Sequence, residues 1–501
     1  MEAPAASEQA GPSRGGTPTA PRASAATRHA MWRIVVAWMF GAAWMYTTMG
    51  AALTKYALAF GMPLFWFGVL AAVPYAGALA QLPTSFFLAR YGHRKRVFTI
   101  AGMLYRGLWI PIALIPWVLP DAWWWPALLV IMAVSSFGSN VMSPAVLSWF
   151  ADVIPSRVRG RFFARWRQGG TAVGLVATLL VPVLLDIAEP AGRLALMRTI
   201  SIAFAAAAVL GMIDFLWLLP LPDVAHRPDR KITLWQLFRV PLADRNFRHV
   251  LGYTATLTLG MGFVGQFAWL YLFDVIGLSN KQANLLLLAV PMVVGLVVVG
   301  AWGRLVDRLG YKPTLVIAGA LIVHGAAAWI LVRPGSLWLG YALVLVAVAA
   351  WSGVELANFN ILLGMSASRR GQRQGSAYLA VNSVAVAAAG VLSGFLGGAV
   401  ASWLGKDWHA TIFGWPLTYH GVLFLIAGAI RLSALFWLIG LEEPEAYTTR
   451  DAVRYVFTNI YSNLQQALFT PVRGLVRLGR LAFPIGRPSR REPAEEEEAE
   501  D

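Results

Sequence analysis

Residues 303–313 read GRLVDRLGYKP, and they interrupt a long apolar part of the chain. The run VPMVVGLVVVGAW precedes them at 290–302, and TLVIAGALIV follows at 314–323. A helix needs about 20 apolar residues to cross the hydrocarbon core of a membrane. The charged stretch is too short for a domain, so it predicts a tight loop between two membrane-spanning helices.

The composition excludes an ordinary soluble protein. Of the 501 residues, 58% are hydrophobic and only 13% are charged, whereas a soluble domain usually carries about 25% charged residues. The absence of cysteine excludes disulfides, thiolate metal sites and cysteine nucleophiles. The net charge of +16 comes from basic residues in short gaps between apolar runs. Because that pattern sets membrane orientation, we expect no nucleic-acid partner.

Twelve apolar runs are long enough to span a membrane as helices. They lack the alternation of barrel strands and are about twice too long for them, so we expect an all-α membrane protein with twelve transmembrane helices. The expected spans are 33–56, 63–88, 97–118, 124–152, 169–189, 196–219, 249–273, 280–303, 313–333, 337–365, 376–403 and 417–440.

The basic residues predict the orientation of these spans. Loops after the even-numbered spans are basic, with Arg94, Arg96, Arg159, Arg304 and Arg369 among their residues, whereas loops after odd-numbered spans carry almost no basic residue. Basic loops stay on the cytoplasmic side. We therefore expect both termini in the cytoplasm and a multi-pass protein of the plasma (inner) membrane.

The opening stretch has a second copy, LARYGHRKR, at residues 88–96. The shift that aligns Gly92 with Gly310 also aligns Asn140 with Asn358 and Arg106 with His324. One shift over several spans predicts two pseudo-symmetric six-helix bundles, an architecture that is typical of transporters. The expected segments are a disordered tail at 1–30, bundles at 31–220 and 249–441, a linker at 221–248, and a cytoplasmic amphipathic segment with an acidic tail at 442–501.

GRLVDRLGYK resembles the loop signature of the major facilitator superfamily, G-x-L-x-D-R-x-G-R-R/K, which follows the second helix of each half. The first copy keeps Gly92, Arg94 and Arg96, but Ser85 replaces the first glycine and Ala89 the aspartate. The resemblance covers roughly residues 31–440. It implies a secondary transporter that moves a small solute by alternating access, with proton coupling as one option. The matching residues of the second copy are Gly303, Leu305, Asp307, Arg308, Gly310 and Lys312.

These loops are expected to form a cytoplasmic gate. The carboxylate of Asp307 lies where the N-terminus of a neighbouring helix could receive it, an interaction worth about 0.3–2 kcal/mol. The alternative is an exposed ion pair within a basic loop, worth less than about 1 kcal/mol. Because Ala89 takes the place of this aspartate in the first copy, we expect only the second copy to make the interaction.

Polar residues inside the spans are candidates for substrate binding and coupling. Glu355 is the main one, because an intramembrane charge is costly and usually functional, and Asn358 shares its helix face. The alternative is a neutral Glu355 that bonds to a neighbouring helix. Asn140 and Asn358 could bind substrate or join helices by hydrogen bonds. Gln266 and Asn382 are further candidates.

Other intramembrane charges are interpreted as structural. Arg106, Asp214, His324 and Arg431 fall in helices that the superfamily places outside its cavity, and Arg106 and Asp214 could pair within the first half. The seven histidines form no metal-ligand cluster, and neither a nucleotide-binding loop nor a nucleophile motif occurs. We expect no metal, no cofactor and no enzymatic activity.

The segment 446–482 differs from the spans because it is amphipathic and basic. Such a segment should lie on anionic lipid, although it could also be a regulatory helix that binds a partner. This leaves a rival function, a non-transporting membrane sensor or assembly factor with a transporter fold. Ala89 and the lack of antiporter motifs favour the rival, while the intact second loop argues against it. We expect a monomer that contacts lipid, a small-molecule substrate and possible coupling protons.

Overall fold

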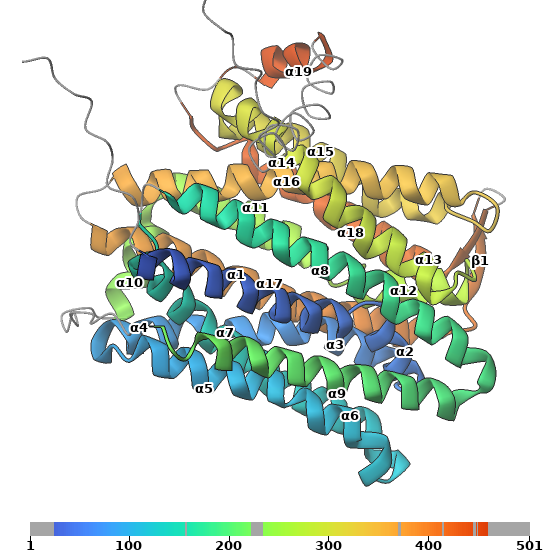
Figure 1. The fold of residues 1–501 in the computed structure, drawn as a ribbon. Helices are drawn as coiled ribbons and strands as arrows, with labels where there is room; N and C mark the ends of the chain where they lie inside the picture. Colours follow the sequence, from blue (N-terminus) through green and yellow to red (C-terminus); the bar gives the residue numbers. More distant parts are fainter. Residues whose placement is uncertain are drawn as a thin grey trace, which may run out of the picture.

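A computed structural model describes residues 25–155, 158–221, 234–368, 372–412, 415–443, 447 and 449–458. These residues form a helical bundle with a single small hairpin (Figure 1). Most of the expected N-terminal tail, linker residues 222–233 and the acidic C-terminus lie outside the described residues.

The first six spans comprise nine α-helices, because three of the spans are broken. Gly50, at φ +71°, separates the first two helices, a backbone conformation that glycine adopts without steric cost. The helices are α1 (Ala25–Thr47), α2 (Ala51–Ala59), α3 (Leu64–Ala78), α4 (Gln81–Tyr91), α5 (Arg94–Gly107), α6 (Trp109–Val118), α7 (Trp124–Val153), α8 (Arg159–Ala188) and α9 (Arg193–Leu218).

The second half follows α10 (Leu234–Ala243) and repeats the arrangement. Its seventh span is broken at residues 260–264, and its eighth contains a π-helical turn, η4 (Leu285–Ala289). The elements are α11 (Arg245–Leu259), α12 (Gly265–Asp274), α13 (Asn280–Asn284), α14 (Val290–Leu309), α15 (Tyr311–Ala327), α16 (Leu337–Ser368), α17 (Gln372–Leu404), β1 (His409–Ile412), β2 (Trp415–Thr418), α18 (Tyr419–Ala434) and α19 (Thr449–Thr458).

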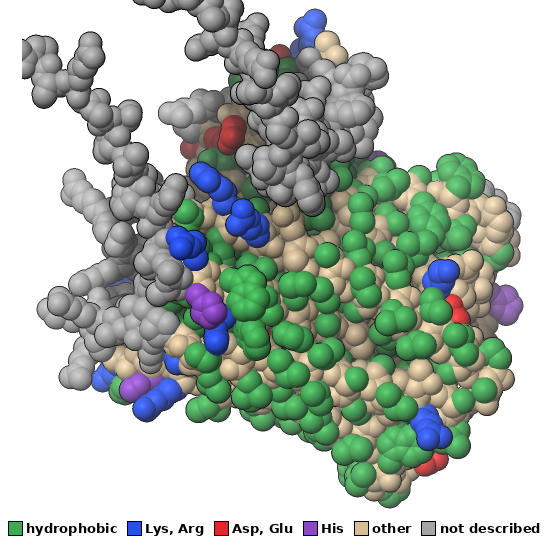
Figure 2. Space-filling view, in the orientation of Figure 1, with side chains coloured by type: hydrophobic (Ala, Val, Ile, Leu, Met, Phe, Trp, Pro, Cys, Tyr) green, Lys and Arg blue, Asp and Glu red, His purple; other side chains and the backbone are tan. Residues whose placement is uncertain are grey.

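The expected number of spans is confirmed by these helices. Ten of the described helices are long and apolar enough to cross a membrane, and α1 with α2 forms an eleventh span bent by 42°. The broken pair of α11 and α12 covers the expected seventh span, residues 249–273. Hydrophobic side chains cover the middle of the face in Figure 2, while Lys and Arg gather toward its two ends. This is the surface that a lipid bilayer requires.

The two ends of the bundle are named here by their elements. The hairpin end carries β1 and β2 and the loops after odd-numbered spans, and the linker end carries α10 and the loops after even-numbered spans (Figure 1). Within the first half, α1 packs on α8 and α9, and within the second, α15 packs on α16 and α18. The halves meet mainly where α3 lies along α17.

Glycines allow α3 and α17 to touch backbone to backbone near the hairpin end. A Cβ added to Gly394 would collide with the carbonyl oxygen of Gly68 and lie 2.7 Å from the Cβ of Ala72. A Cβ on Gly398 would likewise collide with the carbonyl oxygen of Phe65. Small residues permit such close helix contacts in membranes, so this seam depends on the absence of side chains.

Candidate substrate-binding site

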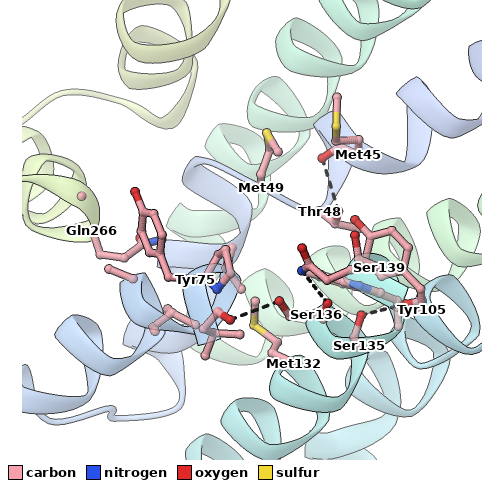
Figure 3. A pocket seen from close by; sticks show the side chains of 18 of the residues that line it. Met45, Thr48, Met49, Tyr75, Tyr105, Met132, Ser135, Ser136, Ser139 and Gln266 are labelled. Atoms are coloured by element: carbon pink, nitrogen blue, oxygen red, sulfur yellow. Dashed lines mark hydrogen bonds between the residues drawn. The ribbon is translucent and has the colours of Figure 1, made fainter. Parts of the chain in front are cut away.

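A cavity of about 560 Å³, called the central cavity below, is lined by side chains of several membrane-spanning helices (Figure 3). Its walls come from the first four spans and from the broken seventh span. Thr48 and Met49 lie in the break between α1 and α2, and Met261 and Gly262 in the break between α11 and α12. Discontinuous helices with a site between two halves are a recurrent way for membrane proteins to bind a solute.

The part of the wall that α7 contributes is polar, but most of its hydrogen-bonding groups already bond to other groups of the protein. The Ser136 hydroxyl donates to the carbonyl of Val73 at 3.1 Å, and the Asn140 amide donates to the carbonyl of Ser136 at 2.9 Å. The Asn140 oxygen accepts from Gln81 at 2.7 Å. Asn140 therefore joins α7 to α4 while it borders the cavity.

Two other polar groups retain bonding capacity. The Gln266 oxygen accepts from Thr54 at 3.1 Å, and its amide nitrogen has no partner among the described residues. The hydroxyl of Tyr75 has only a weak contact with the Met261 sulfur, at 3.9 Å. The Tyr75 ring stands beside Gln266 at one side of the cavity (Figure 3). These groups can bond to a ligand without breaking a strong contact.

The structure separates the site residues that the sequence suggested. Asn140 and Gln266 line the central cavity, whereas Asn358, Asn382 and Glu355 do not. The Asn382 oxygen accepts from Thr254 at 2.9 Å, so it joins α17 to α11. The Asn358 oxygen is buried without a hydrogen-bond partner in the described part of the chain. Asn140 and Asn358, aligned by the repeat, therefore do not share this cavity.

Glu355 lies on an exposed part of α16. Its carboxylate accepts from the indole of Trp351, one turn earlier on the same helix, at 2.9 Å. No hydrogen bond from Glu355 to a neighbouring helix is present among the described residues. The alternative in which such a bond holds a neutral carboxyl is thus not supported in this state.

Arg106 and Asp214 form an ion pair inside the first half, between α5 and α9. They are 4% and 5% exposed, and Arg106 also donates to the carbonyl of Gly211 at 3.1 Å. In the second half, His324 is exposed and bonds within its own helix. Arg431 donates to the carbonyl of Gly260, at the break of the seventh span, at 3.4 Å.

The sequence signature, called the signature loop below, covers the end of α14, the turn at Gly310 and the start of α15. Gly310 has φ +93°, as a tight turn requires, and an added Cβ at Gly303 would meet no atom within 4 Å. Asp307 is exposed, with no bonded partner among the described residues. The Lys312 ammonium donates to the carbonyl of Leu441 at 2.7 Å. The signature lysine thus joins this loop to the end of the twelfth span.

The first half has a similar glycine turn followed by a lysine that bonds to the end of another span. Gly92 turns with φ +72°, and the Lys95 ammonium donates to the carbonyls of Leu219 and Leu221, each at 2.7 Å. Lys95, part of the basic run in the first copy of the signature, thus contacts the end of the sixth span as Lys312 contacts the end of the twelfth. Arg94 is half-buried and Arg96 exposed.

Helix α19 contacts the same signature loop. Arg308 donates to the Tyr455 hydroxyl at 2.9 Å and lies 4.3 Å from the centre of its ring. Ala452 is fully buried, and α19 packs on α15. Residues 449–458 of the C-terminal segment therefore pack on the protein. The rest of the segment, which we expected on lipid, lies outside the described residues.

The halves are tied together at the hairpin end. One carboxylate oxygen of Asp186 on α8 accepts from the backbone and side chain of Asn280, at 2.7 and 2.9 Å, and the other accepts from the Lys281 amide at 3.1 Å. Glu189 bonds to Asn280 at 2.7 Å and pairs with Lys55 at 2.6 Å. Asn280 is fully buried in this network.

The linker end is more open along α14. Added Cβ atoms at Gly295 and Gly300 would meet nothing within 4 Å, and Val293 is 47% exposed. Helix α8 contacts the eighth span mainly at α13 and η4, the part near the hairpin end, and the Thr178 hydroxyl also lies 3.9 Å from the Met292 sulfur at the start of α14. The two halves are therefore bonded to each other at the hairpin end, while this part of α14 is left uncovered.

Residues missed by the sequence analysis include Tyr75, Thr48, Ser136 and Ser139 of the cavity wall. Single polar residues in apolar spans carry little signal, because many of them only join helices. The glycines in the middle of the first and seventh spans, Gly50 and Gly260, were the available sign of a break.

Comparisons with known proteins agree on one family and one fold. Residues 34–390 match the model of the Major Facilitator Superfamily. No curated protein sequence matches the chain significantly.

Among solved structures, a mutant of the nucleoside transporter NupG is similar with a TM-score of 0.65 at 12% identity, over 83% of this chain and 100% of that one. A bacterial homolog of the human lysosomal transporter Spinster, inward-facing and occupied, scores 0.58 at 14%, over 87% and 97%. A D-xylose–proton symporter scores 0.59 at 16%, over 84% and 99%. At this identity the likeness shows a shared fold.

Proposed function

The chain belongs to the major facilitator superfamily, and from this premise we propose that it is a secondary transporter that moves a small solute across the plasma membrane by alternating access. The observation that carries the proposal is the central cavity. It lies between the halves, at the breaks of the first and seventh spans, and it offers Tyr75 and Gln266 to a ligand. A site at the meeting point of two moving halves can be reached from either side in turn.

The asymmetry of the two ends supports alternation. Asp186, Glu189 and Asn280 tie the halves at the hairpin end, while α14 is uncovered toward the linker end. The basic loops predict that the linker end is cytoplasmic, which makes this the inward-facing state. In the opposite state, the carboxylate of Asp307 would reach a helix N-terminus of the first half and Asn280 would leave Asp186.

Uptake into proteoliposomes tests the proposal directly. The purified protein is offered labelled sugars, amino acids, nucleosides, carboxylates and heteroaromatic compounds. We expect uptake of at least one class, with an apparent affinity about tenfold lower in Gln266→Ala because two hydrogen-bonding groups leave the cavity. Asn382→Ala is the matched control, since Asn382 bonds to Thr254 away from the cavity, and it should keep the affinity. Equal loss in both variants would contradict the placement of the site.

We propose Glu355 as the coupling residue, since an exposed carboxylate within a span is costly unless it serves ion movement. Glu355→Gln keeps the shape but cannot exchange a proton. We expect it to abolish accumulation driven by a proton gradient while equilibrative exchange of solute continues. The measurement compares uptake with and without an imposed gradient at two pH values. Normal accumulation with unchanged pH dependence in the variant would remove Glu355 from coupling.

One observation supports the alternative function, a membrane sensor that does not transport: the contact between Tyr455 of α19 and Arg308 of the signature loop. If the signature loop moves between states, this contact would move α19 with it, and a partner protein bound to α19 could respond. A well-folded protein that takes up no solute in the assay above would favour this second function.

A further inference from the structure

The central cavity has features that select one chemical class of solute. We propose that it holds an uncharged molecule with a flat, largely apolar body and one or two hydrogen-bonding groups. This proposal rests on the proposed function, because it names the class of solute that the same cavity carries.

The cavity wall offers no counter-charge. None of its lining residues is an Asp, Glu, Lys, Arg or His. Arg106 lies behind the wall, 5.1 Å from the Trp44 ring, and is neutralised by Asp214. Arg431 stands behind the wall within electrostatic range of the Tyr75 hydroxyl, but it donates to the carbonyl of Gly260 and does not itself line the cavity. A charged solute would lose its hydration here without gaining a partner, which costs several kcal/mol in proteins.

The walls match a flat apolar body. Tyrosine and tryptophan side chains form broad faces on which a planar molecule can stack. Methionines border the same space, and their flexible, polarisable thioethers adapt to aromatic surfaces. A volume of about 560 Å³ suits a molecule of several rings. The residues that form these faces include Trp44, Tyr105, Trp109, Met45 and Met132.

The polar groups of the wall set how such a molecule is held. The amide nitrogen of Gln266 is a donor without a partner among the described residues, and the Tyr75 hydroxyl can donate or accept. Both stand on the same side of the cavity (Figure 3). A solute whose hydrogen-bonding edge meets this pair would place its apolar body against the tryptophans and methionines.

A second cavity, of about 370 Å³, provides an internal contrast. It lies between α1, α8 and α14, and Arg167 lines it beside Trp38 and Trp166, whose rings stack at 4.5 Å. Tyr46 borders it as well. An anionic solute would find its counter-charge here rather than in the central cavity, so the two cavities predict opposite charge preferences.

The test uses matched pairs in which an uncharged amide is exchanged for a carboxylate on the same flat ring system: nicotinamide with nicotinate, 2-naphthamide with 2-naphthoate, and indole-3-acetamide with indole-3-acetate. Binding to the full-length protein is followed by the ligand-induced rise in unfolding temperature. We expect an uncharged member to bind, its anionic partner to bind more than about a hundredfold more weakly, and Tyr75→Phe to weaken the uncharged member about two- to tenfold. Tyr46→Phe is the matched control and should leave the affinity unchanged.

The outcomes separate this proposal from the transport proposal. The uncharged class is overturned if the anionic members bind with equal or higher affinity and lose that binding in Arg167→Gln. It is also overturned if none of the uncharged members binds. Loss of affinity in Tyr46→Phe but not in Tyr75→Phe overturns the assignment to the central cavity. An uncharged ligand that binds through Tyr75 but never enters proteoliposomes leaves the class standing and overturns transport.

Discussion

Replacing Asp214 by asparagine is expected to lower the free energy of unfolding by about 3–5 kcal/mol, the usual effect of removing one partner of a buried ion pair. Arg106 cannot lose its proton, so Asp214→Asn leaves a full positive charge between α5 and α9. The pair also presses against α1, where an added Cβ on Gly41 would lie 2.6 Å from the Asp214 carboxylate. Thermal unfolding of the purified protein in detergent measures the change.

The control for this prediction removes both charges. Arg106→Met combined with Asp214→Leu leaves no unpaired ion, and replacing a buried pair by apolar residues is often neutral or stabilising. The double variant should therefore recover most of the lost stability. If Asp214→Asn unfolds at the same temperature as the unaltered protein, Arg106 has another means of neutralisation and the pair is not structural.

Replacing Gly394 by valine is expected to prevent the hairpin end from closing. The new side chain would collide with the backbone of Gly68 and with Ala72. Overpacking of this kind costs about 1–3 kcal/mol, which reduces the population of the closed state about 5- to 150-fold. Transport should fall by a similar factor, because a carrier that cannot close one end cannot complete its cycle.

Accessibility of the central cavity measures this shift. The chain has no cysteine, so Ser139→Cys introduces a single thiol in the cavity wall. A membrane-impermeant thiol reagent added on the hairpin-end side should label it faster in the Gly394→Val background. Gly107→Val is the control, since an added Cβ there meets only the Met212 sulfur, at 3.6 Å. Slow labelling in both backgrounds, with transport intact, would show that the α3–α17 seam tolerates a side chain.

The sequence by itself determined the spans, the two halves and the family. Each of these follows from a property that accumulates over many residues: the length of an apolar run, the sign of a loop, or one shift that aligns several spans. It also identified Arg106 and Asp214 as possible partners, because two opposite charges in neighbouring apolar spans have few alternatives. The turn at Gly310 was equally readable, since the signature places a glycine where a loop must reverse.

Only the tertiary structure decided which polar residues share the cavity. Asn140 and Asn358 are equivalent in the repeat, yet Asn140 borders the cavity and Asn358 does not. Tyr75 and Gln266 come together across the two halves although 190 residues separate them along the chain. The physical reason is that a residue faces the cavity only if its helix is rotated to turn it inward, and this also depends on where the helix breaks. Both are settled by packing against distant helices, as at Gly68 and Gly394, and no local pattern records them.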